Sequence, residues 1–106
     1  MTTAIPNSTV HIELPYHLQT LARVGPEISL EIRGPVTAAS IVDAIEARYP
    51  MLCGTIRDHV TKQRRPFLRY FACQQDLSHD PSDNPLPAAI TAGTEPFIIW
   101  GALSGG

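Results

Sequence analysis

Two early stretches of the chain alternate between apolar and polar residues, which is the pattern of a half-buried β-strand. They are residues 10–14 and 28–33, and a proline or a Gly-Pro pair follows each of them. The connector between them, residues 16–26, lacks this alternation. We expect three of its apolar side chains to fold back on the core: Leu18, Leu21 and Val24.

A helix is predicted after the second strand, from residue 38 to residue 49. Thr37 is a favourable N-cap, and Val36 and Ile41 have the spacing of a hydrophobic staple. The apolar positions of this helix recur on one face: Ala38, Ile41, Val42, Ile45 and Tyr49. Pro50 ends the helix, because the residue before a proline avoids the helical region.

The middle of the chain predicts further elements. Apolar residues at four-residue spacing predict a short second helix within residues 51–60, and the basic segment 62–66 is expected to be a solvated turn. A third strand is predicted at 67–73, with Arg69 facing away from the helix. In this orientation the inward side chains are Leu68, Tyr70 and Ala72.

Shorter elements follow the third strand. Residues 74–75 are predicted to form a turn, and residues 76–78 a short return strand. The composition of residues 79–85, rich in Asp, Asn, Pro and Ser, predicts a loop. A single helical turn is expected within residues 86–90, before the last strand.

The last strand is an unbroken apolar run. Residues 97–100, Phe-Ile-Ile-Trp, combine β-branched and aromatic side chains, which predicts a central strand. Within it we expect Phe97 and Ile99 to face the core, and Ile98 and Trp100 to face away from it. The side chains then become small, and the sequence closes on Gly-Ala-Leu-Ser-Gly-Gly.

The order of the elements is strand, strand, helix, strand, short strand and strand, which is typical of an α+β domain. The helix has one sheet face on which to bury its apolar stripe. We therefore predict a β-grasp roll: a mixed sheet of about four to five strands, with the last strand central beside the first and one main helix packed across one face. We divide the chain into a flexible arm (1–9), the β-grasp domain (10–102) and a flexible tail (103–106).

Composition and charge narrow the classes of function. The chain has 106 residues and a net charge of -2, which fits a single domain and gives no strong positive field for nucleic acid. No apolar run approaches the roughly 20 residues of a membrane span. The first residues lack the basic and apolar regions of a signal peptide. We therefore expect a cytoplasmic protein without a nucleic-acid or membrane partner.

The two cysteines offer little for catalysis or metal binding. Cys53 and Cys73 are expected to be reduced thiols in the core. Each has a histidine six residues later, at His59 and His79, and this is not a recognised zinc spacing. We therefore predict no metal site. The sequence also lacks a glycine-rich phosphate loop, so no permanently bound cofactor is expected.

Several ordered segments resemble the ubiquitin-like sulfur carriers. This family includes the small subunit of molybdopterin synthase (MoaD-like), the ThiS-type thiamin carriers and the carrier of a thiocarboxylate route to cysteine. The matching segments are the helix and its closing aromatic-Pro pair (36–50), Asp76-Leu77, Ala92-Gly93-Thr94-Glu95 and the ending 98–106. Two departures are Cys73-Gln74-Gln75, where the family usually has an Asn, and the long loop 79–85.

The resemblance implies that other enzymes act on the C-terminus. An E1-like enzyme would use ATP to adenylate the carboxylate of Gly106, and a persulfide sulfur would then convert it to a thiocarboxylate. Leu103, Ser104 and Gly105 would thread through the partner's channel, because a chain without bulky side chains fits a narrow passage. The protein would be a carrier and not an enzyme. A sulfur-accepting biosynthetic enzyme would be its second partner.

Three functions stay open at this point. The first is a sulfur carrier, with the molybdopterin or cysteine pathway favoured over thiamin by resemblance alone. The second is a ubiquitin-like modifier that forms isopeptide bonds through Gly106. The third is an interaction module that does not react.

A docking surface is predicted on the sheet. If the third and last strands are neighbours, Phe71 and Trp100 meet on the face opposite the helix, with Phe67 nearby. Exposed aromatic side chains of this kind mark protein interfaces. The alternative is that Trp100 fills the core.

Overall fold

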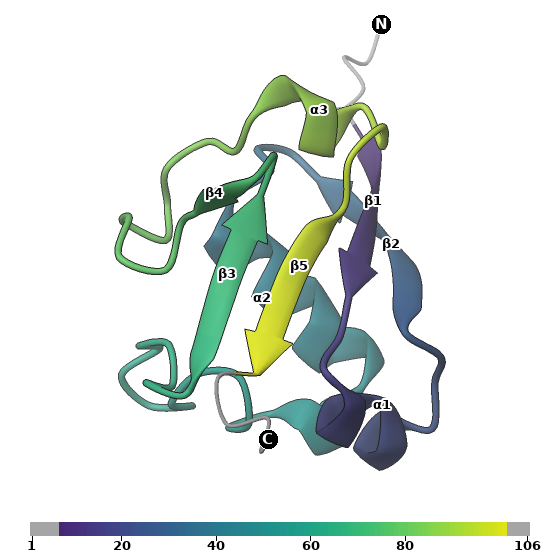
Figure 1. Cartoon of the computed structure of the whole chain (residues 1–106), viewed down its shortest axis with the longest axis vertical. Coiled ribbons are helices and arrows are strands. Elements are labelled where there is room, and N and C mark those ends of the chain that lie inside the picture. Colours follow the sequence, from purple (N-terminus) through teal and green to yellow (C-terminus); the bar gives the residue numbers. More distant parts are fainter. Residues whose placement is uncertain (1–6, 102–106) are drawn as a thin grey trace, which may run out of the picture.

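The computed structural model describes residues 7–101, and within them five strands form one sheet. The strands are β1 (Asn7–Glu13), β2 (Glu27–Arg33), β3 (Leu68–Ala72), β4 (Gln75–Asp76) and β5 (Phe97–Gly101). Their order across the sheet is β2-β1-β5-β3-β4, and Figure 1 shows β5 between β1 and β3. The β1–β5 pair is parallel and the other pairs are antiparallel, so the sheet is mixed.

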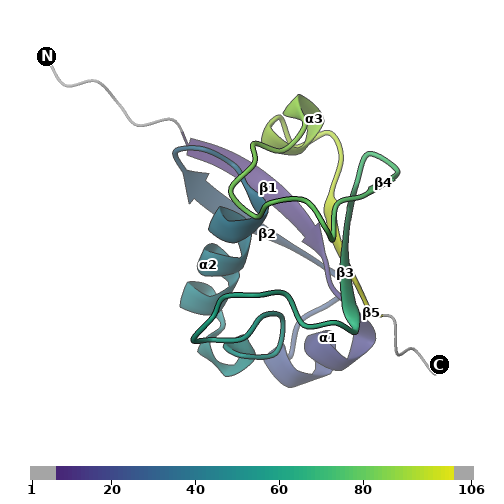
Figure 2. The ribbon, with the colours of Figure 1, turned by 90° about the vertical axis from the view of Figure 1, so that its left-hand side faces the viewer.

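The main helix, α2 (Ala38–Arg48), packs across one face of this sheet (Figure 2). It begins with a capping box, as the Thr37 N-cap predicted: the Ser40 backbone N–H donates to the Thr37 hydroxyl over 3.0 Å, and the Thr37 N–H donates to the Ser40 hydroxyl over 2.8 Å. Four of the five predicted inward residues are buried, and Tyr49, at the C-cap, is half-buried.

The core lies between α2 and the sheet. Its largest fully buried side chains are Phe97, Ile12, Leu18, Ile41, Ile45, Leu52, Ile56, Leu68, Ile90, Ile99, Val10 and Val42. The central position of β5 follows from its composition, because a strand with neighbours on both sides and one covered face buries more apolar surface than an edge strand. The predicted α+β fold, a β-grasp roll with a mixed sheet, is confirmed.

The N-terminal region contains more regular structure than we predicted. Strand β1 begins at Asn7, so residues 7–9, which we predicted to belong to the arm, are strand. They pair with β2 in a ladder that runs from Asn7 opposite Arg33 to Glu13 opposite Glu27. The rest of the predicted arm, residues 1–6, lies outside the described residues.

The connector after β1 forms a helix that we did not predict, α1 (Tyr16–Ala22). The backbone of Pro15 is extended before it, and Arg23 ends it in the left-handed region at φ 59°. Leu18 is fully buried, but Leu21 is 48% exposed, so the prediction that Leu21 packs on the core is wrong. Seven residues span only about two turns, too few for a clear helical period.

The second predicted helix, within residues 51–60, is wrong. Only the 3₁₀ turn η1 (Pro50–Leu52) forms there. Gly54 adopts φ 86°, and the Asp58 carboxylate accepts the backbone N–H groups of Val60 and Thr61, both over 2.8 Å, which folds the chain into a turn instead.

The basic segment after this turn is only partly solvated. Lys62 and Gln63 are exposed, as predicted. Arg64 and Arg65 are half-buried, and their Nε atoms donate to the carbonyls of Ser78 and Gly54 over 3.0 and 2.9 Å. These two guanidinium groups therefore hold the loop in place, because they satisfy backbone acceptors that no strand or helix pairs.

The hairpin after β3 is shifted by one residue. Cys73 and Gln74 adopt positive φ angles of 51° and 67° and form the turn, so β4 starts at Gln75 and not at Asp76. Residues 79–85 form no helix or strand, in agreement with the predicted loop. The predicted single turn before the last strand is a short helix, α3 (Ala88–Thr91), which buries Ile90.

Candidate functional site

Strand β5 presents two different faces. Its inward residues Phe97 and Ile99 are 0% and 1% exposed, whereas Trp100 is 51% exposed on the face opposite α2. This alternation is the one we predicted for residues 97–100. The alternative in which Trp100 fills the core is therefore wrong.

The side chains of Phe71 and Trp100 contact each other on the outer face of the sheet. Strand β3 pairs with β5 so that Arg69 lies opposite Trp100 and Phe71 opposite Ile98. Phe71 and Trp100 are thus diagonal neighbours, and their rings meet edge to face with centroids 5.9 Å apart. The cross-strand register fixes the position of the indole.

A shallow apolar hollow surrounds this aromatic pair. We call it the outer-face patch, and its lining residues are Phe71, Cys73, Gln74, Glu95, Pro96, Ile98 and Trp100. Phe67, which we predicted to lie beside the pair, precedes β3 and packs partly against the core. It does not line the hollow.

Five members of the outer-face patch were not in the predicted docking set: Cys73, Gln74, Glu95, Pro96 and Ile98. The alternation of β5 already indicated that Ile98 faces outward. The alternation predicted for residues 67–73 likewise directs Cys73 away from the helix. Gln74, Glu95 and Pro96 lie beyond the ends of β3 and β5, where no strand period predicts a side-chain direction. Cys73 is half-buried, and Cys53 is exposed, so the prediction of a core thiol is wrong for Cys53.

An ion pair borders the outer-face patch. Arg69 Nη1 lies 3.1 Å from Asp76 Oδ2, with each side chain a little more than one-third exposed. Hydrogen bonds from the side chain and backbone of Ser78 hold the pKa of the Asp76 carboxyl below its ordinary value, and Arg69 adds to this effect. Asp76 therefore stays negatively charged at neutral pH, beside an apolar surface.

The end of β5 lies against α1. Gly101 is buried, and a Cβ atom on it would lie 3.4 Å from Pro15 Cβ and 3.6 Å from His17 Cε1. The helix that we did not predict thus flanks the end of β5. The predicted reactive residues follow this point, and Leu103, Ser104, Gly105 and Gly106 lie outside the described residues.

Among residues 7–101, no group of three or more His, Cys, Asp or Glu side chains is placed to hold a metal ion. Within the same range, no helix is long and apolar enough to cross a membrane.

Solved structures from archaea and bacteria share this fold. SAMP1 from Haloferax volcanii superposes with a TM-score of 0.70 at 14% identity, over 92% of this chain and 99% of that chain. The small archaeal modifier protein 1 (SAMP1) from Methanosarcina acetivorans gives a TM-score of 0.69 at 17% identity, over 95% and 99%. A chain of the Amycolatopsis orientalis BexX/CysO complex gives 0.68 at 17%, over 92% and 99%.

These likenesses cover nearly the whole of each chain, and they show the ubiquitin-like β-grasp fold. No protein-family model matches the chain, and a comparison with curated proteins finds no match. The predicted resemblance to ubiquitin-like carriers is therefore confirmed in the fold.

Proposed function

We propose that this chain is a ubiquitin-like sulfur carrier whose reactive group is the carboxylate of Gly106. An E1-like enzyme adenylates this carboxylate with ATP, and a sulfur donor converts the adenylate to a thiocarboxylate. The thiocarboxylate then supplies sulfur to a biosynthetic enzyme, with the molybdopterin or cysteine type of pathway favoured. The chain itself is the substrate of these enzymes and binds no permanent cofactor.

One observation carries the proposal. Strand β5 holds Trp100 of the outer-face patch and ends one residue later, at Gly101. The segment that closes on Gly-Gly therefore begins beside an exposed apolar surface. A partner that covers this surface would have the C-terminal segment within reach, so that docking and chemistry are coupled by a single strand.

The chemistry explains why a carrier needs such a segment. A carboxylate is a poor electrophile, because neither oxygen is a leaving group. The carboxylate oxygen attacks the α-phosphorus of ATP and pyrophosphate leaves, which gives an acyl adenylate. A persulfide sulfur then attacks the acyl carbon and AMP leaves; a thiol reduces the resulting acyl disulfide and releases the thiocarboxylate. Gly105 and Gly106 contribute access and no acid or base.

The outer-face patch is the docking surface in this proposal. Phe71, Ile98 and Trp100 supply apolar contacts at its centre, and Arg69 with Asp76 supplies a polar border. An apolar centre with a polar rim is the usual anatomy of a protein interface. Phe67 is left outside it, because its side chain packs partly against the core.

A second candidate function is that of a protein modifier, in which a lysine amine attacks the same adenylate-derived acyl group. The names of two similar structures favour it, since both are small archaeal modifier proteins. Lysine-linked conjugates of this chain in its native cells would support the modifier. A small-molecule product that requires Gly106 would support the sulfur carrier.

Deletion of Gly106 tests the proposed reactive group. The shortened chain should lose adenylation by the activating enzyme and should no longer support its pathway. Its thermal unfolding temperature should match that of the full chain, because the core is built from residues 8–101. A shortened chain that still supports the pathway would contradict the proposal.

A further inference from the structure

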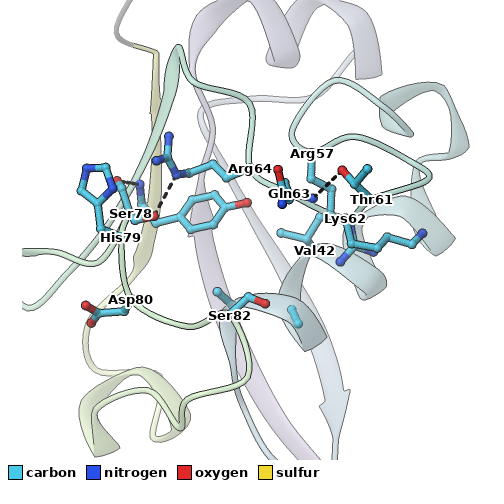
Figure 3. A pocket seen from close by; sticks show the side chains of 13 residues that line it. Val42, Arg57, Thr61, Lys62, Gln63, Arg64, Ser78, His79, Asp80 and Ser82 are labelled. Carbon is cyan, nitrogen blue, oxygen red and sulfur yellow. Dashed lines mark hydrogen bonds between the residues drawn. The ribbon is translucent and has the colours of Figure 1, made fainter.

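A cavity of about 640 Å³ lies on the helix side of the sheet, away from the outer-face patch. Its walls come from the start of α2, the loop 57–64, Tyr70 of β3 and the segment 78–82. Figure 3 shows Arg64, Ser78 and His79 on one side of it and Thr61 and Lys62 on the other. Its size is that of small-molecule sites, which span about 300–1,000 Å³. The proposed carrier function does not use this cavity.

Tyr70 brings a buried hydroxyl donor to the cavity. Tyr70 is only 6% exposed. Burial raises the pKa of its phenol to about 12, so the hydroxyl keeps its proton at neutral pH. Within residues 7–101 this hydroxyl makes no hydrogen bond, yet no sealed side-chain polar atom in that range lacks a partner. The hydroxyl is therefore not sealed, and Tyr70 is one of the residues that line the cavity.

Arg57 brings a second buried donor. Its side chain is 6% exposed, and Nη2 lies 3.0 Å from Glu46 Oε1 and also bonds Asp43, while Nε donates to Glu46 over 3.3 Å. Burial opposes the charge of the guanidinium, but these two carboxylates raise its pKa. Nη1 has no hydrogen-bond partner among residues 7–101 and is not sealed, and Arg57 is one of the residues that line the cavity.

The remaining charges around the cavity favour an anion at its mouth. Lys62 is exposed there, and the Nε and Nη1 atoms of Arg64 are held by backbone carbonyls, which leaves Nη2 available. Asp80 is the acidic residue among the lining residues, and His79 lies beside it. At the mouth Lys62 and Arg64 outnumber Asp80 by one charge. Asp43 and Glu46 outnumber Arg57 by one on the α2 wall, so the positive excess is confined to the mouth.

We propose that this cavity binds a small phosphate-bearing molecule, with the Tyr70 hydroxyl and Arg57 Nη1 as inner donors and Lys62 and Arg64 as outer cations. A phosphate group has several acceptor oxygens and no donor that it must satisfy, which matches a site made mostly of donors. Guanidinium groups suit this geometry better than other cations. A ligand that binds only the folded state also stabilises it against unfolding.

Titration of the full-length chain with inorganic phosphate and with ribose 5-phosphate, followed by ¹H–¹⁵N NMR, tests the site. Saturable shift changes should concentrate in residues 57–64 and 78–82, with little change on the outer face of β5. Tighter binding of ribose 5-phosphate would identify an organic phosphate as the ligand class, and equal affinities would identify free phosphate. Absence of saturable changes with both probes would overturn the proposal.

Three variants separate the site from general charge. Tyr70→Phe should weaken binding about tenfold or more and leave the unliganded unfolding temperature unchanged, because the hydroxyl has no protein partner to lose. Lys62→Gln should also weaken binding. Arg33→Gln, which removes an exposed cation on β2, is the matched control and should bind as the wild type does. Wild-type affinity in Tyr70→Phe, or equal losses in Lys62→Gln and Arg33→Gln, would overturn the proposal.

Discussion

The large side chain of Trp100 is half-exposed and is also fixed in position. Half of its surface is exposed, yet its ring is held edge to face against Phe71. A fixed, half-exposed indole can be buried by a partner at little cost in side-chain entropy, because its rotamer is already restricted. At the residue scale this makes Trp100 the best candidate for a binding hot spot.

Replacement of Trp100 by alanine should therefore affect binding more than folding. We expect affinity for the activating enzyme to fall by about 2 kcal/mol or more, and the free energy of unfolding by about 1 kcal/mol, the size of one aromatic contact. Calorimetric titration and chemical denaturation measure the two quantities. Val60→Ala, at an apolar residue that is 74% exposed outside the patch, is the control. A loss of about 3–5 kcal/mol in stability, the range for a core aromatic, would contradict this role.

Asp58 predicts a dependence of stability on pH. Backbone N–H groups, first that of Thr61 and then that of Val60, hold the pKa of its carboxyl below the ordinary value of 3.8. The unfolded chain therefore takes up the proton at higher pH than the folded chain does. The stability that these hydrogen bonds give the folded state is fully present above pH 3.8 and is lost as the pH falls through the lower pKa of the folded state.

Chemical denaturation across the acid range checks this linkage. Asp58→Ala should lose less stability than the wild type as the pH falls below 3.8, because its unfolding no longer takes up this proton. Asp83→Ala serves as the control for removal of an exposed acid. If Asp58→Ala and the wild type lose stability in parallel, the turn around Asp58 does not have the hydrogen bonds described.

At the scale of elements, a buried ion cluster joins the loop after η1 to α2. Arg57 is nearly inaccessible and contacts Glu46, 11% exposed, and Asp43, 67% exposed. The loop has no strand or helix between η1 and β3. This cluster, together with the hydrogen bonds of Arg64 and Arg65, holds the loop in place instead of regular backbone pairing. The guanidinium needs the buried carboxylate of Glu46, because an uncompensated buried charge is strongly unfavourable.

The two carboxylates of this cluster should contribute unequally. Glu46→Ala should lower the free energy of unfolding by about 3 kcal/mol or more, since it removes the buried partner of a buried charge. Asp43→Ala removes a largely exposed partner and should cost less than about 1 kcal/mol. Urea denaturation of the two variants gives the comparison directly. Equal losses would show that burial does not set the strength of these pairs.

The elements that the sequence predicts correctly are those with a long or unbroken pattern. The alternation of 28–33, the stripe and N-cap of α2 and the apolar run of β5 each repeat over enough residues to exclude other structures. The outward direction of Trp100 follows from the same periodicity. Helix α1 spans too few turns to show a period, and the apolar spacing in residues 51–60 reflects the burial of Leu52 and Ile56 in an irregular loop.

The sites depend on contacts that no local pattern contains. Glu46 and Asp43 read as ordinary surface charges of a helix until Arg57, in a distant loop, is brought against them. Gln74 and Pro96 join the outer-face patch through the pairing of β3 with β5. Only the tertiary fold places these residues together, so sequence periodicity alone does not predict them.

At the scale of the whole molecule, the two faces of the sheet have different roles in our account. The α2 face buries the core and carries the phosphate cavity, while the opposite face carries the outer-face patch. Strand β5 contributes to the core with one side, presents Trp100 with the other, and leads into the segment that ends on Gly106. A folded handle with a reactive end is the arrangement that a carrier requires.

The intact mass of the protein purified from its native cells decides whether it carries sulfur. We expect a fraction of chains in which one sulfur replaces one oxygen, with the change confined to the C-terminal fragment that contains Gly106. Unmodified chains together with lysine-linked conjugates of higher mass would contradict the sulfur carrier and favour the modifier. Unmodified chains without conjugates would contradict both and leave a protein that binds partners without reacting.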